Sequence, residues 1–189
     1  MKKALSEMSL EELRQLFPIY LVKHKESWAL QYAAMEQSLR RALPAGAGYR
    51  ISHIGSTSVR GIMAKDIVDI LLEVKDGLSV ETAAAAAETT GFIRMSEEPE
   101  RISLNSGYTP DGFADEVFHL HIRRRGDNDE LYFRDYLNGH PEEAAAYEEL
   151  KLGLWKRFEH DRDAYTNAKT DFIRARTLIA RELYGDRYA

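Results

Sequence analysis

The sequence predicts an α+β protein in which a mixed β-sheet is flanked by helices and followed by a helical C-terminal segment. Between residues 49 and 123, short runs show the two-residue alternation typical of strands. Before and between these runs, apolar residues recur at the three- and four-residue steps of amphipathic helices. From about residue 128 onward only the helical pattern remains. We therefore expect a single domain over residues 1–189, with an α/β core over residues 1–125 and C-terminal helices over residues 126–189.

Two helices are predicted before the first strand. The run Ser9-Leu10-Glu11-Glu12 has the capping-box pattern that begins a helix, and Pro18 should end that helix. A longer helix is predicted between His24 and Leu43, where apolar residues lie three and four positions apart until the chain reaches Pro44. We expect this helix to pack its apolar side against a sheet.

The first two predicted strands lie on either side of a glycine turn. Tyr49 to Ile54 is an apolar-rich run that stops at Gly55, and Ile67 to Val74 is a second run of strand character. Alternation makes one face of the second strand fully apolar, so that face belongs in the core. The other face carries Asp69 and Glu73. Burial of an ionised carboxylate costs free energy unless it is paired or binds a metal, so these acids are candidate site residues.

A helix and three more strands should follow. Residues 79–90 are alanine-rich and helical by propensity. The strands are expected at 92–95, 101–106 and 116–123, with residues 107–112 as a turn. In the last strand His119 and His121 share the face opposite the apolar one. We expect both imidazoles to lie beside the carboxylates of the earlier strand.

Three helices are predicted for the end of the chain. The first runs from about Asn128 to Asn138, the second begins at Pro141, and the third runs from about Arg162 to Tyr184.

Composition excludes several classes of protein. The net charge of −5 and the pI of about 5.7 disfavour a long nucleic acid as partner. Because the chain has no cysteine, it has neither disulfides nor thiolate metal sites, and its nucleophile is not a thiol. No apolar run is long enough to span a bilayer, and no apolar signal segment follows the N-terminal lysines. We expect a cytoplasmic protein without a membrane partner.

The turn after the first strand is a candidate phosphate-binding site. Gly55 allows close approach of the backbone to a ligand, and the hydroxyls and amides of Ser56, Thr57 and Ser58 can point at an anion. The alternative is an ordinary strand-to-helix turn with a helix cap. Taken alone, the Gly-Ser pair favours the ordinary turn. Asp69 follows Ser56 with twelve residues between them, and the family resemblance given below makes this combination favour phosphate binding.

Motifs in the same order over nearly the whole chain after about residue 18 resemble the GrpB (UPF0157) family. They are His53–Val59, Lys65, Ile67–Leu71, His119–His121, Phe133–Leu137, His140-Pro141, Tyr147, Lys151, Tyr165, Ala168-Lys169 and Phe172-Ile173. The resemblance implies a nucleotidyltransferase-like fold. It also implies a likeness to the accessory domain found fused to some dephospho-CoA kinases.

The function implied by this resemblance is metal-dependent nucleotidyl transfer to a small molecule or a protein side chain, with Mg²⁺ and a nucleoside triphosphate. The superfamily pattern has a Gly-Ser pair and two acids one residue apart. Gly55-Ser56 and Asp69 fit this pattern, whereas Leu71 stands at the second acidic position. His119 and His121 would complete the catalytic set with Asp69. The candidate metal ligands are Asp69, Glu73 and His121, although Glu73 lies about 13 Å along the strand from Asp69.

The remaining candidate site residues are expected to bind phosphate, and the sequence also allows two alternative functions. Besides the turn residues 55–58, the phosphate-binding candidates are Lys65, Arg134, Lys151 and Lys169. The alternative for Arg134, Lys151 and Lys169 is an ordinary solvated charge on the surface of a helix. The alternative for Lys65 is an ion pair with Asp69. The first alternative function is a non-catalytic nucleotide- or coenzyme-binding accessory module, which Leu71 favours. The second is a zinc hydrolase built on His53, His119, His121 and Asp69. The sequence assigns neither the acceptor nor the oligomeric state.

Overall fold

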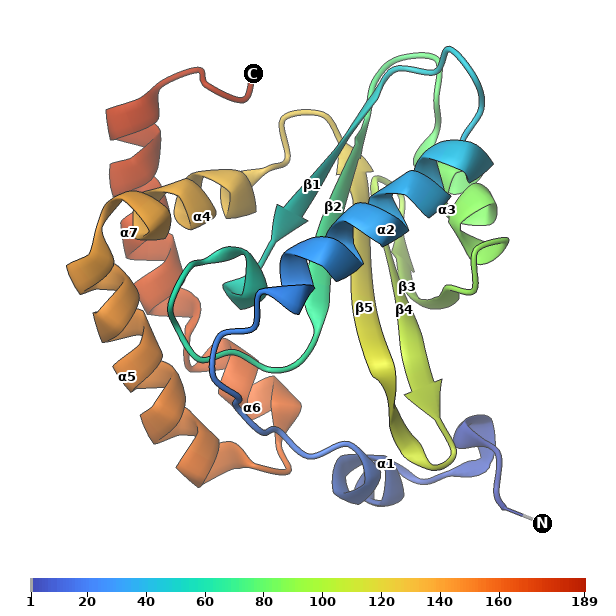
Figure 1. Ribbon diagram of the computed structural model, residues 1–189. Helices are drawn as coiled ribbons and strands as arrows, with labels where there is room; N and C mark the ends of the chain where they lie inside the picture. Colours follow the sequence, from blue (N-terminus) through green and yellow to red (C-terminus); the bar gives the residue numbers. More distant parts are fainter. Residues whose placement is uncertain (1) are drawn as a thin grey trace.

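The computed structural model describes residues 2–189, which contain a five-stranded mixed sheet (Figure 1). Its order is β1-β2-β5-β4-β3, and the strands are β1 (Tyr49–Ile54), β2 (Val68–Val74), β3 (Ile93–Glu98), β4 (Arg101–Thr109) and β5 (Gly112–Arg124). The central pair β2–β5 is parallel and the other pairs are antiparallel. The predicted α+β class is therefore confirmed.

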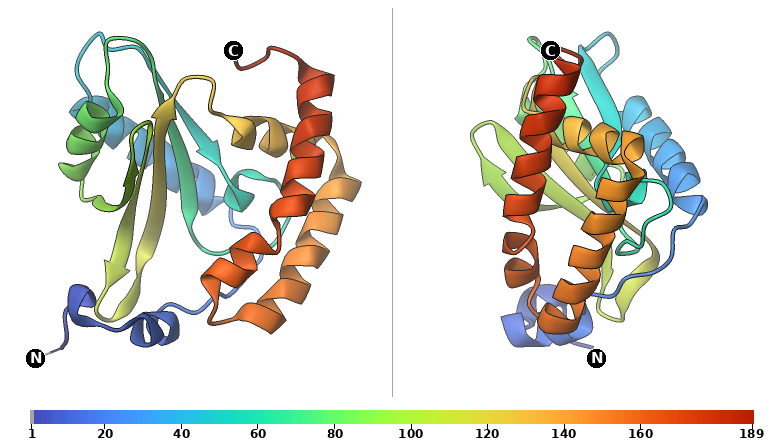
Figure 2. Two further views of the ribbon diagram at one scale, coloured as in Figure 1. Left: turned by 180° about the vertical axis from the view of Figure 1, so that it is seen from behind. Right: turned by 90° about the vertical axis from the view of Figure 1, so that its left-hand side faces the viewer.

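Helices lie on both sides of this sheet. They are α1 (Leu10–Leu16), α2 (Ser27–Ala42), α3 (Val80–Glu88), α4 (Asp129–Gly139), α5 (Pro141–Phe158), α6 (Arg162–Asn167) and α7 (Thr170–Tyr184), with 3-10 turns η1 (Leu5–Glu7) and η2 (Ser56–Ser58). Helices α2 and α3 cover one face, and α4 to α7 form a group beside the β1 end of the sheet (Figure 2). Across residues 2–189, none of the helices combines the length and the apolar character that a bilayer crossing requires.

The predicted capping box is present at the start of α1. The Ser9 hydroxyl accepts from the Glu12 amide at 3.2 Å, and the Glu12 carboxylate accepts from the Ser9 amide at 2.6 Å. Two amide groups that no helical carbonyl could pair are thus satisfied, so α1 begins where the sequence predicts.

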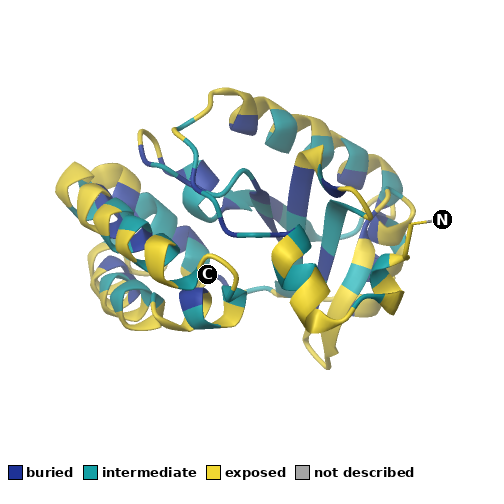
Figure 3. Ribbon diagram, turned by 90° about the horizontal axis from the view of Figure 1, so that it is seen from below, coloured by how far each residue is buried: buried dark blue, intermediate teal, exposed yellow. Residues whose placement is uncertain are grey.

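The core lies between the sheet and the helices α2 and α3. Its sheet side consists of alternate residues of the central strands, among them Val68, Ile70, Leu72, Leu120 and Ile122, and all of these are buried. Complete burial of such a side chain contributes about 1.5–3 kcal/mol each. The alternation predicted for both strands is confirmed, and the opposite face is left for polar residues. Seen from below, the helices of the C-terminal group turn buried residues inward and exposed residues outward (Figure 3).

The hairpin β4–β5 is longer than predicted. Residues 107–112 were expected to form the turn, but strand pairing continues to Thr109 and resumes at Gly112. Gly107, at φ +87, forms an irregularity in the ladder between Ser106 and Tyr108, and a Cβ there would overlap the Glu116 carbonyl. Between the pairs Ser106–Phe118 and Tyr108–Phe113, the single residue Gly107 of β4 lies opposite four residues of β5, and both strands continue beyond this bulge. Gly107 is therefore part of the strand and does not begin the turn.

The predicted third C-terminal helix is divided into two. Helix α6 starts at its cap Asp161, whose side chain accepts from the Ala164 amide at 3.1 Å. It ends at residues 168–169, where the Lys169 amide donates to Thr166 across three residues instead of four. The chain then restarts as α7, and the break places Lys169 beside the cavity described next.

Candidate functional site

A cavity of about 730 Å³ lies between the polar face of the sheet and the C-terminal helices. Residues of the turn after β1, of β2 and of β5 form one wall, and residues of α4 to α7 form the other. Of the site residues predicted from the sequence, all except His53, Ser58 and Glu73 line it: Gly55, Ser56, Thr57, Lys65, Asp69, His119, His121, Arg134, Lys151 and Lys169. Distant segments of the chain therefore meet around one space.

The glycine turn is in direct contact with Asp69. Gly55 has φ 70° and ψ −173°, a backbone region that is essentially restricted to glycine. A Cβ on Gly55 would overlap Asp69 Oδ2 and lie 2.9 Å from Asp69 Cγ. Ser58 does not line the cavity, because its hydroxyl donates to the Gly55 carbonyl at 2.6 Å. The prediction that Ser58 binds phosphate is therefore wrong, and the hydroxyl stabilises the turn.

Asp69 and His119 are paired through the parallel register of β2 and β5. His119 Nδ1 lies 3.1 Å from Asp69 Oδ1. Burial opposes ionisation of Asp69, but the hydrogen bond from His119 and the positive potential of Lys65 and the histidines lower the Asp69 pKa to about 2. An ionised carboxylate only accepts hydrogen bonds, so His119 Nδ1–H is the donor.

The other nitrogen of His119 contacts a residue that the sequence pattern did not indicate. His119 Nε2 lies 2.8 Å from the Tyr108 hydroxyl, and Arg162 Nη1 donates to the same hydroxyl oxygen at 3.1 Å. With Nδ1–H donating to Asp69, a neutral His119 accepts from Tyr108 at Nε2. The bulge at Gly107 shifts the alternation of β4, which brings Tyr108 to the same face as Ser103 and Asn105. Recognition of that glycine as a bulge could have identified Tyr108.

His121 is the second imidazole of the site. Its ligand nitrogen lies within 4.8 Å of ligand atoms of Asp69 and His119. Its Nδ1 lies 3.5 Å from the Ser103 hydroxyl. Burial lowers the His121 pKa to about 4, so the ring is neutral at pH 7 and has a lone pair available.

Glu73 does not belong to this site. Its carboxylate is fully buried and accepts two hydrogen bonds from Arg50, at 2.5 and 2.8 Å. The Gly126 amide and the Asn128 side chain donate to it at 3.2 and 2.9 Å. The prediction that Glu73 is a metal ligand is therefore wrong, because its direct register partner on β1 is an arginine that neutralises it.

Leu71, at the second acidic position of the pattern, is fully buried. It packs with Ile54 and Leu131 in a small apolar cluster. An acid at this position would lose these hydrocarbon contacts. The packing of the cluster therefore favours an apolar residue in place of the second acid.

Three lysines give the cavity its positive charge. Burial lowers the pKa of Lys151 to about 7 and that of Lys169 to about 8, and like charges of neighbouring lysines contribute to both shifts. Burial also lowers the Lys65 pKa, against the attraction of Asp69. The Lys169 ammonium lies 4.4 Å from the centre of the Tyr165 ring. Burial of like charges together is unfavourable, so a bound anion would stabilise all three charged forms.

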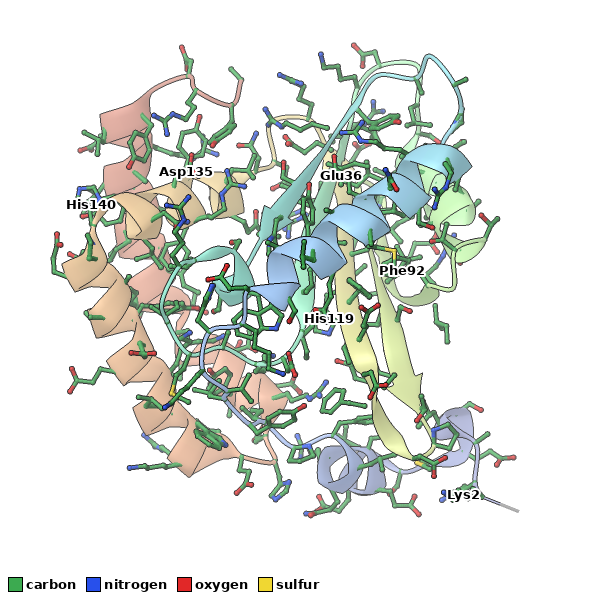
Figure 4. All side chains as sticks on the ribbon, in the orientation of Figure 1. Lys2, Glu36, Phe92, His119, Asp135 and His140 are labelled. Carbon is green, nitrogen blue, oxygen red and sulfur yellow. The ribbon has the colours of Figure 1, made fainter. Side chains whose placement is uncertain are left out.

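Arg134 lines the cavity, but its guanidinium already has protein partners. It donates to the Asp135 carboxylate at 2.8 Å, to the His53 carbonyl at 2.8 Å and to the Tyr188 hydroxyl at 3.0 Å. Figure 4 labels Asp135 on α4 and His119 lower in the molecule. Arg134 thus joins α4 to the end of β1, two residues before Gly55, and positions the turn.

His53 lies outside the cavity. Its ring stacks on Tyr32 with centroids 4.9 Å apart, and its Nε2 is 3.0 Å from the Thr57 hydroxyl. Burial lowers the His53 pKa to about 4. The four-residue zinc set considered from the sequence is therefore reduced to Asp69, His119 and His121.

Related sequences match most of the chain. The sequence model of the family described as GrpB protein matches residues 18–177. A UPF0157 protein of Pseudomonas aeruginosa is 36% identical over 150 residues, which cover 78% of this chain and 61% of that protein. The glutamate-rich protein GrpB of Alkalihalophilus pseudofirmus is 30% identical over 165 residues, which cover 82% of this chain and 91% of that protein. The chain therefore spans only part of the length of the Pseudomonas relative.

Two solved structures illustrate the fold of this chain. The crystal structure of the conserved protein GrpB from Enterococcus faecalis has a TM-score of 0.73 at 27% identity and covers 87% of this chain and 99% of that chain. The Cid1 poly(U) polymerase with Mg 3′-dATP bound has a TM-score of 0.52 at 11% identity and covers 84% of this chain and 51% of that chain. At such low identity the second likeness concerns the fold alone, and it confirms the predicted nucleotidyltransferase-like fold.

Proposed function

The chain belongs to the GrpB family, and we propose that it is a metal-dependent nucleotidyltransferase whose nucleoside triphosphate occupies the cavity beside Asp69. One observation carries this proposal. A glycine turn that is in contact with an ionised carboxylate shares one cavity with the buried Lys151 and the half-buried Lys65 and Lys169. The turn and the lysines suit phosphate groups, and the carboxylate with its imidazoles suits a metal ion.

The phosphates would lie between the turn and the lysines. Ser56 and Thr57 supply main-chain and hydroxyl donors on the sheet side, and Lys169 and Lys151 supply positive charge from the helices. Such a site binds an anion from two sides and excludes water from between them. Arg134 is assigned a positioning role, because all its guanidinium nitrogens already donate to protein groups.

The reaction would form a bond from the oxygen of an acceptor hydroxyl to the α-phosphorus and break the bond from this phosphorus to the oxygen that bridges to the β-phosphate. Pyrophosphate would leave, and the hydroxyl proton would pass to solvent. A divalent ion beside Asp69 would neutralise negative charge on the reacting phosphates. Magnesium, the ion named with the fold neighbour, prefers an all-oxygen set, and the cluster of one carboxylate and two imidazoles does not fit it. We therefore assign no step to magnesium. The acceptor, a small molecule or a protein side chain, would enter from the side of α7, where Arg174 and Leu178 line the cavity.

Pyrophosphate release tests this proposal without knowledge of the acceptor. Purified protein would be incubated with each nucleoside triphosphate, divalent ions and a protein-free small-molecule extract, and pyrophosphate would be measured enzymatically. We expect release that depends on the protein and one nucleotide and that Asp69→Asn abolishes. Asp76→Asn is the matched control, because Asp76 is exposed just after the other end of β2 and does not line the cavity. Release that Asp69→Asn leaves unchanged would contradict the proposal.

The second candidate is a nucleotide- or coenzyme-binding module without catalysis. The observation that favours it is Leu71, which fills the position of the second acid with packed hydrocarbon. This candidate predicts that a non-hydrolysable triphosphate analogue binds with an affinity that Lys169→Met reduces, while no pyrophosphate is released with any acceptor. Binding and release measured on the same samples separate the two functions.

A further inference from the structure

We infer that Asp69, His119 and His121 form a site for a divalent transition-metal ion that accepts nitrogen ligands, such as zinc, in place of magnesium. The inference rests on the proposed function, because it concerns the same cavity. It adds the identity of the ion, which the fold alone would assign differently.

The spacing of the donor atoms suits one shared ion. Ligand atoms of the three side chains all lie within 4.8 Å of one another, and His119 Nδ1 and Asp69 Oδ1 are 3.1 Å apart. Two ligands that are each about 2.1 Å from one ion are separated by about 3.0 Å at a right angle and about 3.4 Å at a tetrahedral angle. The pair is therefore already at the separation that one shared ion requires.

Each imidazole also has a polar partner at the ring nitrogen that would not bind the ion. His119 is held at Nε2 by Tyr108, whose hydroxyl also accepts from Arg162. His121 has Ser103 at its Nδ1, 3.5 Å away. Metal-binding histidines almost always make a hydrogen bond through the nitrogen that does not bind the metal. The polar partners lie at His119 Nε2 and His121 Nδ1, which leaves His119 Nδ1 and His121 Nε2 for an ion. An ion at His119 Nδ1 would displace the proton that this nitrogen donates to Asp69, and His119 Nε2–H would then donate to the Tyr108 hydroxyl.

The same face of β2 offers no further oxygen donor within reach of this cluster. Leu71 lies two residues beyond Asp69 and packs in hydrocarbon, and Glu73 is bound by Arg50 and Asn128. Magnesium requires near-octahedral oxygen ligands, whereas imidazole suits zinc, copper, iron and nickel. Three protein ligands that border a cavity also leave coordination positions for a phosphate oxygen.

Equilibrium dialysis tests the inference without nucleotide or turnover. Tag-free, chelator-treated protein would be dialysed against Zn²⁺, Mn²⁺ or Mg²⁺, and bound metal would be measured by elemental analysis. We expect one ion per chain, with affinity for Zn²⁺ greater than for Mn²⁺ and affinity for Mg²⁺ at least about 100-fold below that for Zn²⁺. No bound ion, or Mg²⁺ bound as tightly as Zn²⁺, would overturn the inference.

Variants assign the binding to these side chains. His121→Ala should lower Zn²⁺ affinity by about 100-fold or more, and Tyr108→Phe, which removes only the hydroxyl behind His119, by about 10-fold. His160→Ala is the control, because His160 is exposed and its ring contacts the Arg14 carbonyl away from the cavity. Unfolding curves in chelator would verify that each variant folds. Equal loss of metal in His160→Ala would mean adventitious binding and would contradict the inference.

One substitution should weaken the preference for Zn²⁺ over Mg²⁺. His121→Asp replaces a nitrogen ligand by an oxygen ligand, so we expect the ratio of Zn²⁺ to Mg²⁺ affinity to fall by about 100-fold. An unchanged ratio in a folded variant would contradict the assignment of His121. Triphosphate binding measured without any metal tests the nucleotide site of the proposed function. The metal assignment can therefore fail while nucleotide binding is found, and the reverse can also occur.

Discussion

Asp69 and Glu73 lie on the same face of β2, four residues apart, yet they have different surroundings. Glu73 is fully buried and accepts hydrogen bonds from Arg50, Gly126 and Asn128. Asp69 accepts from one imidazole and borders a cavity. The partners at each end of the strand, and not the face itself, decide which carboxylate is structural and which is available to a ligand.

The neighbouring strands explain this difference. On β1, Arg50 stands directly opposite Glu73, whereas Ile54 stands opposite Asp69, just before the chain turns at Gly55. On β5, Arg123 is in register with Glu73 and His119 with Asp69. One end of the sheet is therefore neutralised by fixed cations, and the other has neutral or titratable partners and open space.

Glu73→Ala should produce the largest loss of stability. Removal of one partner from a buried ion pair leaves the other uncompensated, which typically costs about 3–5 kcal/mol of unfolding free energy. Urea unfolding at pH 7 measures this loss. Asp69→Asn is the matched control at the open end, where we expect less than half that cost. Equal losses at both ends would contradict the distinction between them.

Gly55→Ala should damage the open end specifically. The Gly-only backbone conformation costs about 1–3 kcal/mol for another residue, and the new methyl group would also displace the Asp69 carboxylate. We expect a loss of stability in that range together with loss of triphosphate binding, measured by calorimetric titration. Gly61→Ala, also at positive φ but with no atom within 4 Å of the new Cβ, separates backbone strain from displacement of Asp69. If both variants bind nucleotide alike, the contact with Asp69 has no role in binding.

Triphosphate binding should weaken as the pH rises from 7 to 9. In the free protein the pKa values of Lys151 and Lys169 are lowered to about 7 and about 8, so both lose charge in this window. A bound polyanion raises these pKa values, so binding takes up protons there and affinity falls as the pH rises, by up to about tenfold per pH unit for each lysine. Lys169→Met should weaken binding at pH 7 and flatten the profile. An affinity independent of pH would contradict the role of the lysines.

Tyr188→Phe should have the smallest effect. The Tyr188 hydroxyl accepts from Arg134 and donates to Asp135, outside the cavity. Loss of these bonds should cost about 0.5–1.5 kcal/mol of unfolding free energy. Because Arg134 also donates to the His53 carbonyl before the turn, we expect a weak secondary loss of nucleotide affinity. A large loss of affinity with unchanged stability would mean that Tyr188 contacts the ligand.

Much of this arrangement could be predicted from local patterns. Alternation in residues 68–74 and 116–123 identified the core face and placed Asp69, His119 and His121 together, because side-chain period and strand register are local properties. The same alternation led to the wrong prediction that Glu73 binds metal, because the role of Glu73 depends on its ion pair with Arg50 of another strand. Tyr108 was missed for a similar reason: its direction is set by the bulge at Gly107, which has no signature in the alternation of β4 alone.

Charged residues of the helices were predicted only in part. Lys169 lies beside the cavity because the chain breaks between α6 and α7, whereas the sequence pattern predicted a continuous helix there. Arg134 was correctly predicted to lie near the turn. Its guanidinium donates to three protein groups, so its assigned role is to position the backbone of the turn and not to bind phosphate. Whether a charge is free or already paired depends on tertiary contacts that periodicity does not encode.

The most direct test of the central claim is calorimetric titration of a non-hydrolysable triphosphate analogue into wild type and Asp69→Asn, with and without Mn²⁺. We expect Mn²⁺ to strengthen binding to wild type by about tenfold or more and to have no effect on Asp69→Asn. Without metal, the variant should bind at least as tightly as wild type, because a negative charge has been removed from the phosphate site. Absence of binding to wild type, or an equal effect of Mn²⁺ on both proteins, would contradict the claim.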